Sequence, residues 1–293
     1  MNLREYLAQQ QKLVDAQLDR LVPTESTPPE TIHRAMRYSL FAGGKRIRPI
    51  LCIEAARAVS DSVEGVVAAS CALELIHTYS LIHDDLPALD NDDYRRGKLT
   101  NHKVFGDAMA ILAGDALLTL AFQVLAQLAI AGDRKILLVA ELAAASGTVG
   151  GMLGGQVADL EGEGKPPEAD LLETIHRAKT GALLRASLRL GAIYAGASGE
   201  QYAGLSRYGE HVGLAFQIVD DILDVEASSE SLGKTAGKDA AQHKITFPAV
   251  YGLEASRRMA EEECAHAHAT LAPFGPRAER LHELADLIVQ RKS

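Results

Sequence analysis

Residues 81–97 read Leu-Ile-His-Asp-Asp-Leu-Pro-Ala-Leu-Asp-Asn-Asp-Asp-Tyr-Arg-Arg-Gly, and this charged segment directly follows an apolar run with helical spacing. Five aspartates fall within ten positions, and two arginines follow them. Packing alone does not explain so much acid beside a core helix, because burying an unpaired carboxylate is expensive. Clustered carboxylates favour a hard cation such as Mg²⁺ or Mn²⁺, and neighbouring guanidinium groups favour phosphate.

A second acidic group lies far downstream, where residues 216–224 read Phe-Gln-Ile-Val-Asp-Asp-Ile-Leu-Asp. Asp220 and Asp224 are four positions apart, so a helix places them on one face, and Gln217 lies one turn earlier. Alone, this pattern also fits an amphipathic helix, and the first acidic run alone also fits a solvated helix end. The two groups together favour a metal site.

The first acidic group is less regular than the second. Asp84 and Asp90 are six positions apart, which would point them about 120° apart on an ideal helix. Pro87 lies between them, and proline disrupts a helix interior. We therefore predict a helix end or local bulge that returns Asp90 to the side of Asp84.

A basic segment precedes the first acidic group, where residues 43–49 read Gly-Gly-Lys-Arg-Ile-Arg-Pro. Two glycines let the backbone approach a ligand closely, and Lys45, Arg46 and Arg48 together predict an anion site. Pro49 disfavours the helical region for Arg48, which predicts a loop or a first helical turn there. The alternative is an exposed basic turn.

These motifs resemble those of the trans-prenyl diphosphate synthases, and most closely those of bacterial-type farnesyl diphosphate synthases. The first motif of that family reads Asp-Asp, two or four residues, Asp, and the second reads Asp-Asp-x-x-Asp. Here the first motif has the four-residue form and the second is intact. The resemblance extends from about Gly43 to Pro248. It implies an all-α, isoprenoid-synthase-type helical bundle around a deep apolar cavity, with the two acidic motifs on facing helices.

Metal binding is the role that the resemblance gives to both acidic motifs. It implies about three Mg²⁺ ions, with Mn²⁺ as an alternative. The implied ligands are Asp84, Asp85, Asp90, Asp220, Asp221 and Asp224. Ions held there would polarise an allylic diphosphate and stabilise it as a leaving group.

The resemblance also implies two diphosphate sites. Isopentenyl diphosphate would be held by Lys45, Arg48, His77 and Arg96. The allylic diphosphate would be contacted by Arg95 and, from the polar loop after the second motif, by Lys234 and Lys244. The allylic cation would be faced by Lys179, Thr180 and Gln217. No strong protein base is evident at the implied position, so the departing diphosphate is the implied proton acceptor.

Without the resemblance, simpler interpretations would hold for two of these positions. His77 shares a helix stripe with Asp84 and would be a structural histidine. Lys179 would be a surface lysine beside a back-bonding threonine, Thr180.

Product length is predicted from the residues just before the first motif. Tyr79 stands five residues before Asp84, about 7–8 Å along the helix axis, where a bulky ring beside Ser80 can close the floor of a cavity. In the resembling family, farnesyl-forming members carry an aromatic residue here, so we predict synthesis of farnesyl diphosphate from dimethylallyl or geranyl diphosphate. Tyr79 as an ordinary core aromatic is the alternative. A geranyl or geranylgeranyl product also stays open.

Two other classes of protein share part of this pattern. A terpene cyclase would use a similar acidic motif, but it would not need the second diphosphate site around residues 43–48. A non-catalytic subunit of a heteromeric synthase typically loses its acidic motifs, whereas this chain keeps both.

The length allows one or two domains, and because no long linker divides the chain we predict one all-α domain over residues 1–293. The net charge of −9 argues against nucleic acid and against an anionic membrane surface as partners. The amino terminus lacks a signal-peptide apolar region and no uninterrupted apolar run reaches membrane length, so we expect no stable membrane association. Cys52, Cys71 and Cys264 have no metal-type spacing and fit buried thiols in a reducing cytoplasm. A homodimer is expected from the resemblance alone.

Apolar residues recur at three- and four-residue spacing, and strand signals are almost absent. This pattern predicts roughly ten helices. They span residues 2–22, 29–42, 46–59, 62–87, 106–130, 133–157, 169–195, 199–225, 245–271 and 277–291. The helix at 133–157 contains several glycines, which would permit close approach of a neighbouring helix or of substrate.

Overall fold

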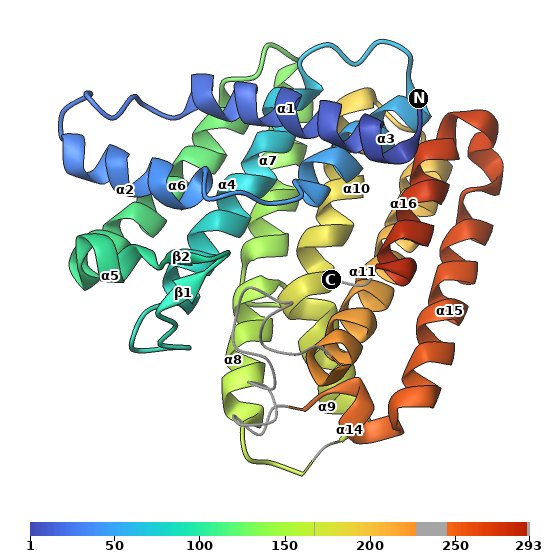
Figure 1. Ribbon diagram of the computed structural model, residues 1–293. Helices are drawn as coiled ribbons and strands as arrows, with labels where there is room; N and C mark the ends of the chain where they lie inside the picture. Colours follow the sequence, from blue (N-terminus) through green and yellow to red (C-terminus); the bar gives the residue numbers. More distant parts are fainter. Residues whose placement is uncertain (167, 227–244, 292–293) are drawn as a thin grey trace. The chain divides into compact units, whose positions relative to one another are not determined.

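A computed structural model describes residues 1–166, 168–226 and 245–291 of the protein (Figure 1). Within these ranges nearly all of the regular secondary structure is helical. The strands in the described residues are β1 (Tyr94–Arg95) and β2 (Lys98–Leu99), which pair antiparallel as a small hairpin. The prediction of an all-α protein is confirmed.

The chain divides into two compact units. The first comprises Met1–Ile50 and Glu64–Val139, and the second comprises Leu51–Val63 and Ala140–Ser293. The chain passes between the units within two helices, α3 (Ile47–Val59) and α7 (Gly132–Ser146), and at the turn before residue 64. The division does not test the prediction of one domain, which stays a prediction.

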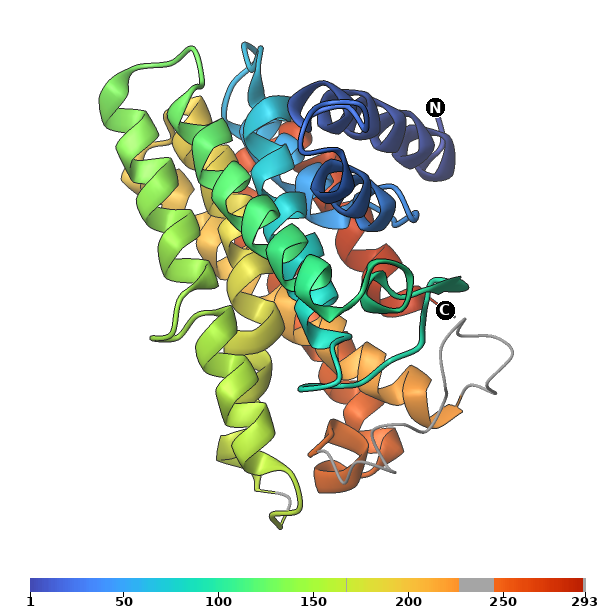
Figure 2. The same cartoon turned by 90° about the vertical axis from the view of Figure 1, so that its left-hand side faces the viewer.

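The first unit is built around α4 (Val66–Asp84). This helix is apolar on almost every face and is buried on most sides, as expected of a central helix. A second long apolar helix, α6 (Asp107–Ala126), packs along it (Figure 2). The other helices of this unit are α1 (Leu3–Leu21), α2 (Glu30–Leu40) and α5 (Asn101–Phe105).

The second unit is built around α11 (Gly199–Glu226). It packs against α10 (Ala182–Ala195) and α15 (Leu253–Thr270). The fully buried Tyr208 of α11 donates its hydroxyl proton to the carbonyl of Leu281, at 2.6 Å, and so joins α11 to the last helix. The remaining elements are α8 (Met152–Gly162), α9 (Ala169–His176), the π-helical turn η1 (Arg177–Gly181), α14 (Phe247–Tyr251), the 3₁₀ segment η2 (Ala272–Ala278) and α16 (Glu279–Gln290).

The prediction of one helix over residues 133–157 is wrong, because the glycines divide it. α7 ends at Ser146 and α8 begins at Met152. Between them Gly150 has a φ of +65°, a conformation that side chains disfavour. The close approach expected of the glycines is nevertheless present in α8, where a side chain at Gly155 would overlap the backbone of Lys179.

Two other predicted helices are interrupted. The run at 169–195 contains η1, which includes Lys179 and Thr180. The run at 245–271 is broken at Gly252, between α14 and α15. Elsewhere the predicted boundaries lie within a few residues of the observed ones, as for the helix predicted at 199–225.

In the part of the chain that the structure describes, two helices, α4 and α6, are long and apolar enough to span a membrane on length and composition alone. In α4, 67% of the most apolar window is buried inside the protein, as in the core helix of a globular unit. In α6 the share is only 39%, which leaves Ile111 and Leu112 exposed. α6 therefore carries an uncovered apolar face.

Candidate active site

The first acidic motif is a closed turn at the carboxyl end of α4. The helix ends at Asp84, and the amide of Asp90 donates a hydrogen bond to the carbonyl of Asp84 at 2.8 Å. The amide of Asp92 likewise returns to the carbonyl of Asp85, at 3.2 Å, and Asn91 adopts a φ of +50°. The predicted helix end that returns Asp90 to Asp84 is confirmed.

The second aspartate of this motif is already paired with an arginine. Asp85 is only 3% exposed and accepts hydrogen bonds from Arg95 Nε at 2.8 Å and from Nη2 at 2.6 Å. Burial by itself would lower the pKa of Arg95, but the hydrogen bonds and charge of Asp85 raise it, so the guanidinium stays charged. Arg95, predicted to contact the allylic diphosphate, is therefore held at the motif by Asp85.

The glycine pair before α3 makes room for Arg96. Gly43 and Gly44 have φ values of +102° and +138°, and Arg96 donates a hydrogen bond to the carbonyl of Gly43. A Cβ atom at residue 44 would lie 2.8 Å from Arg96 Nη1. At Gly44 the predicted close approach is an approach to Arg96, whereas a Cβ atom at Gly43 would meet no atom within 4 Å.

Arg46 does not belong to the anion site, so the prediction that all three cations of residues 43–49 form it is wrong for this residue. Arg46 is 3% exposed and its guanidinium donates to Asp15 at 2.8 Å and to Glu74 at 2.6 Å. It also donates to the carbonyl of Leu40 at 2.7 Å. The side chain joins α1, α2 and α4 and is a structural ion pair. Of the segment's cations, the exposed Lys45 and the half-buried Arg48 stay as candidate phosphate ligands.

Arg48 lies in the first turn of α3, as predicted from Pro49, and near His77 of α4. Burial lowers the pKa of His77 well below its ordinary value, and the charges of Arg48, Arg96 and Arg95 lower it further. The imidazole is therefore neutral near pH 7 and is surrounded by guanidinium groups. An anion bound among them would offset this positive potential.

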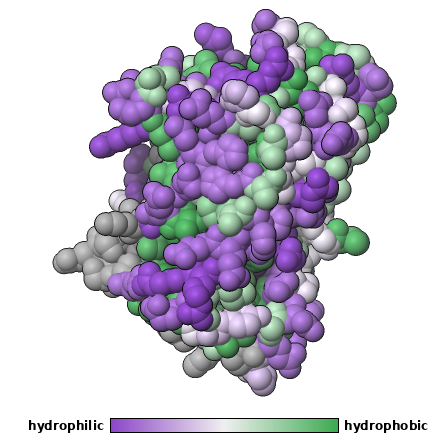
Figure 3. Space-filling view, turned by 90° about the vertical axis from the view of Figure 1, so that its right-hand side faces the viewer, coloured by the Kyte–Doolittle hydropathy of each residue, from purple (hydrophilic) through white to green (hydrophobic). Residues whose placement is uncertain are grey.

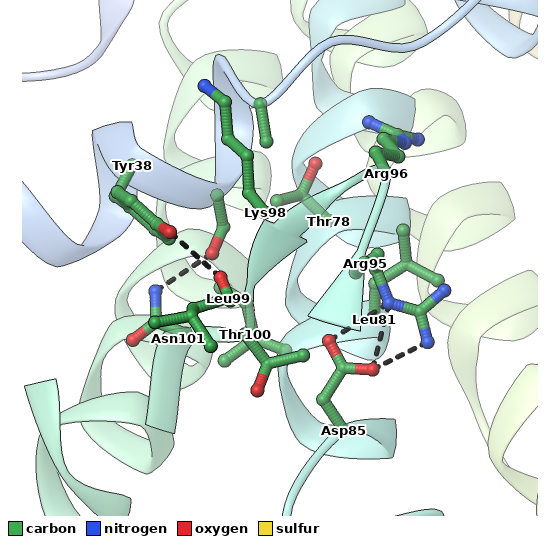
Figure 4. A pocket seen from close by; sticks show the side chains of 13 residues that line it. Tyr38, Thr78, Leu81, Asp85, Arg95, Arg96, Lys98, Leu99, Thr100 and Asn101 are labelled. Atoms are coloured by element: carbon green, nitrogen blue, oxygen red, sulfur yellow. Dashed lines mark hydrogen bonds and ion pairs between the residues drawn. The ribbon is translucent and has the colours of Figure 1, made fainter. Parts of the chain in front are cut away.

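A pocket in the first unit lies between α2, the end of α4 and the hairpin (Figure 4). It brings Lys98 to the same site as Arg95, Arg96 and Asp85, so cations outnumber carboxylates on its wall. Tyr38 fixes one side by donating its hydroxyl proton to the carbonyl of Leu99 at 2.8 Å. The sequence interpretation did not include Lys98, although it follows Arg96 by two positions.

Tyr79 is buried and packs edge-on against His83, with ring centroids 5.7 Å apart. Burial raises the pKa of the Tyr79 hydroxyl to about 12, with a further contribution from Asp84. His83 in turn contacts α6, where its Nε2 lies 3.1 Å from the carbonyl of Ile111 and a side chain at Gly114 would overlap the ring. Sequence reasoning missed His83, whose ring packs against Tyr79, and Gly114, whose lack of a side chain leaves room for that imidazole. Ser80 donates to the carbonyl of His77 at 2.9 Å.

In the second motif the middle aspartate is again held by protein groups. Asp221 is 4% exposed and accepts a hydrogen bond from the amide of Phe247 at 2.9 Å. His176 Nε2 lies 3.2 Å from the same carboxylate, and Gln217 donates to it at 3.4 Å. Asp221 therefore ties α11 to the start of α14, whereas Asp220 and Asp224 are partly exposed.

Two further basic side chains lie at this end of the second unit. Arg291, after α16, lies 3.2 Å from Asp220 and stacks over the Phe216 ring at 4.0 Å. Lys179 in η1 forms an ion pair with Asp159 at 2.6 Å, and Thr180 follows it in the same π-helical turn. π-Helical turns are frequent at functional sites. The sequence analysis assigned no role to Arg291, which the fold brings to the second motif.

Within the first unit, the structure thus brings Arg48, His77, Arg95 and Arg96 to the region of the first motif. Within the second unit, it brings Gln217, Asp221 and Asp220 together with Arg291. Lys234 and Lys244 lie outside the described residues, so their predicted contacts stay predictions.

Comparison with known proteins identifies the family. The profile of the Polyprenyl synthetase family matches residues 29–271. A dimethylallyltranstransferase of Fischerella ambigua is 50% identical over 99% of this chain and 84% of its own length. A geranylgeranyl diphosphate synthase of Cyanophora paradoxa is 44% identical over 100% of this chain and 97% of its own length.

Solved structures of prenyl diphosphate synthases have the same fold as this chain. The geranylgeranyl pyrophosphate synthetase of Pyrococcus horikoshii superposes with a TM-score of 0.90 at 31% identity, over 99% of this chain and 98% of that one. An FPP/GFPP synthase of Zymomonas mobilis gives a TM-score of 0.87 at 38% identity, over 98% and 99%. The fold is therefore the helical fold of the isoprenoid synthases, as predicted. The chain belongs to the polyprenyl synthetase family. It is a prenyltransferase of isoprenoid synthesis.

Proposed function

We propose that the protein condenses isopentenyl diphosphate with an allylic diphosphate in a head-to-tail prenyl transfer. The observation that carries this proposal is the closed turn that returns Asp90 to Asp84 in the same unit as the basic group around His77. The closed turn suits a metal-bound diphosphate, and the basic group suits a second diphosphate. The family membership supports the same reaction.

Mg²⁺ is the cofactor that fits this donor set, with Mn²⁺ as an alternative, because the available ligands are carboxylate oxygens. Bound Mg²⁺ would neutralise charge that develops on the departing diphosphate. The residues that would hold it are Asp84, Asp90, Asp220 and Asp224. Asp85 and Asp221 were also predicted as ligands, and we now propose that they position the site, because each is buried and held by protein donors.

The remaining side chains bind either of the two diphosphates or face the allylic cation. Isopentenyl diphosphate binds to Lys45, Arg48, His77 and Arg96. The allylic diphosphate meets Arg95, Lys234 and Lys244. The hydroxyl of Thr180 and the amide of Gln217 direct oxygen dipoles at the allylic cation, and Lys179 supplies positive charge. The departing diphosphate accepts the proton that is lost after the new bond forms.

Farnesyl diphosphate is the product that the buried ring of Tyr79 favours. The ring lies five residues, about 1.4 turns, before Asp84 and packs against His83, which supports a role in limiting chain growth. The second candidate product is geranylgeranyl diphosphate. It is favoured by the names of several relatives, including the Cyanophora paradoxa enzyme and several chloroplastic enzymes of Arabidopsis thaliana.

Assembly as a homodimer is supported by α6. A helix that is apolar all round is normally buried, yet Ile111 and Leu112 of α6 are 45% and 50% exposed. One relative, from Arabidopsis thaliana, is named as the large subunit of a heterodimeric synthase, so a heteromeric assembly is the competing proposal. Sedimentation of the purified chain alone separates the two.

We also propose a cytoplasmic location. Several relatives are named as chloroplastic, so a chloroplastic location is the competing proposal.

The test of function is incubation of the purified chain with isopentenyl and dimethylallyl diphosphates and Mg²⁺, followed by sizing of the products. Accumulation of a C15 diphosphate supports the farnesyl proposal, and accumulation of a C20 diphosphate supports the second candidate. A cyclised hydrocarbon from the allylic substrate alone would indicate a terpene cyclase. No condensation at any Mg²⁺ concentration would support a non-catalytic subunit.

A further inference from the structure

A group of side chains of the kinds that ligate metals lies in the second unit, on α15 and α16, apart from the residues assigned to prenyl transfer. The two helices run side by side in Figure 1. Cys264 and His268 are four positions apart on α15, so they occupy one face of that helix. His282 and Asp286 are four positions apart on α16. Each helix therefore presents a pair of potential ligands.

The geometry joins the two pairs. His268 Nε2 lies 2.8 Å from Asp286 Oδ1, and Cys264 Sγ lies 3.8 Å from the same oxygen. One ligand atom from each of these three residues lies within 4.8 Å of the others. Ligands of a tetrahedral zinc ion are separated by roughly 3.3–3.7 Å, given zinc–ligand bonds of 2.0–2.3 Å. Side-chain adjustments of about an ångström would therefore bring the three atoms onto one ion.

The second nitrogen of His268 has its own partner. Its Nδ1 lies 2.6 Å from Nδ1 of His282, and the two rings stack with centroids 4.9 Å apart. A histidine that binds a metal through one nitrogen usually donates a hydrogen bond from the other, which fixes the ring orientation. His282 is placed to accept that hydrogen bond.

We propose that this cluster is a binding site for a thiophilic divalent cation, best matched by Zn²⁺, with the ligands Cys264, His268 and Asp286. His282 is a positioning residue that orients His268. Three protein ligands leave a fourth position for water or another small ligand. This site lies outside the two aspartate motifs, and its sulfur and imidazole donors select a softer ion than Mg²⁺.

Access to the site is open. The side chains of His268 and Asp286 are 30% and 49% exposed, whereas Cys264 is only 8% exposed. Figure 3 shows mostly hydrophilic side chains on the side of the molecule where α15 lies. A hydrated ion can thus reach the carboxylate first and then the buried sulfur.

An ion at this site would link α15 to α16. Asp286 precedes Arg291 by five residues, and Arg291 contacts Asp220 of the second motif. The link would therefore hold the carboxy-terminal helix in the position from which Arg291 reaches that aspartate. A cation bound only by the folded protein also stabilises it.

A second group of potential metal ligands, on α11 and α15, provides a matched control for the proposed site. His211 of α11 lies 2.7 Å from Glu263, and His266 is close to both. This group contains no sulfur. His266 is also more exposed than the ligands proposed above, with 61% of its side chain accessible.

The experiment uses Co²⁺ as a spectroscopic probe on the chelator-treated full chain, with Mg²⁺ in excess. We expect one equivalent of Co²⁺ to give visible bands of a tetrahedral ion and a sulfur-to-cobalt charge-transfer band, both removed by Zn²⁺. Cys264→Ser should remove the charge-transfer band. Asp286→Asn, a conservative change at a half-exposed position, should abolish tight binding, and it decides the question if the cysteine variant fails to fold.

His282→Asn should weaken Co²⁺ binding by roughly tenfold to a hundredfold without loss of the charge-transfer band, as expected for an orienting partner. His266→Asn should leave the spectrum unchanged. The proposal is overturned if the wild-type protein gives no charge-transfer band. It is also overturned if the band survives Cys264→Ser, or if His266→Asn removes it. A hydrogen-bonded relay without a metal would give the first of these results.

Discussion

Replacement of Gly44 by alanine tests whether Arg96 binds isopentenyl diphosphate. The new Cβ atom would lie 2.8 Å from Nη1, 3.0 Å from Cζ and 3.1 Å from Nη2 of Arg96. Ordinary contacts of a Cβ atom are longer than 3.4 Å, so the guanidinium must move by about half an ångström or more. Because it is the far end of a flexible side chain, the move costs little stability but displaces the charge.

The size of the effect follows from the lost interaction. A hydrogen bond to a charged group contributes about 1.5–3 kcal/mol, and each 1.4 kcal/mol is a factor of ten in affinity. Gly44→Ala should therefore raise the KM for isopentenyl diphosphate about tenfold or more. The KM for the allylic substrate should change little, because Arg96 is assigned to the other diphosphate.

Gly43→Ala is the matched control. Its φ of +102° imposes backbone strain similar to that at Gly44, but no atom lies within 4 Å of the new Cβ. Initial rates with either substrate varied, together with thermal unfolding of both variants, separate strain from displacement of Arg96. Equal KM values for isopentenyl diphosphate in the two variants would show that Arg96 does not bind this substrate. An effect confined to the allylic substrate would show the same.

Three further predictions concern the first unit. Arg46→Met should lower the free energy of unfolding by about 3–5 kcal/mol, because it leaves the Glu74 carboxylate, 3% exposed, without its partner; a denaturant midpoint like that of the wild type would contradict the structural role. The depressed pKa of His77 means that the unfolded chain takes up a proton near pH 6.5 while the folded chain does not, so stability should fall as the pH drops below about 6.5. His77→Gln should flatten that part of the stability profile, and an unchanged profile would show that His77 is not the group concerned. Tyr79→Ala should lengthen the products with little change in the KM for isopentenyl diphosphate, and products of unchanged length would place the floor elsewhere.

The sequence was sufficient for most of the helices and for the place of both acidic motifs, because these depend on local patterns. Apolar periodicity predicted a helix at 199–225, and α11 spans Gly199–Glu226. Pro87 predicted the turn at the first motif. The break between α7 and α8 was missed, because helical spacing of apolar residues continues across it and the conformation of Gly150 is not visible in a sequence.

The tasks of individual charged residues were harder to predict, because they depend on partners distant in the chain. Arg46 looks like its neighbour Lys45 in the sequence, but its partner Glu74 lies on another helix. Asp221 looks like Asp220, but it accepts a hydrogen bond from the amide of Phe247, 26 residues later. Such pairings follow from tertiary packing and leave no local pattern.

The cysteines illustrate the same limit. Their mutual spacing indicated no metal site. The ligands grouped with Cys264 are instead a histidine one turn along α15 and an aspartate on α16. Only the packing of those two helices brings the three side chains together.

The turnover of single aspartate variants at saturating Mg²⁺ tests most directly the proposal that both acidic motifs serve one metal-assisted prenyl transfer. Asp84→Ala and Asp220→Ala should each lower kcat by about a hundredfold or more while leaving the thermal unfolding temperature near that of the wild type. Asp93→Ala, which removes an exposed aspartate of the same loop that pairs with Lys103, is the control and should turn over normally. Near-normal turnover in either motif variant would contradict the account.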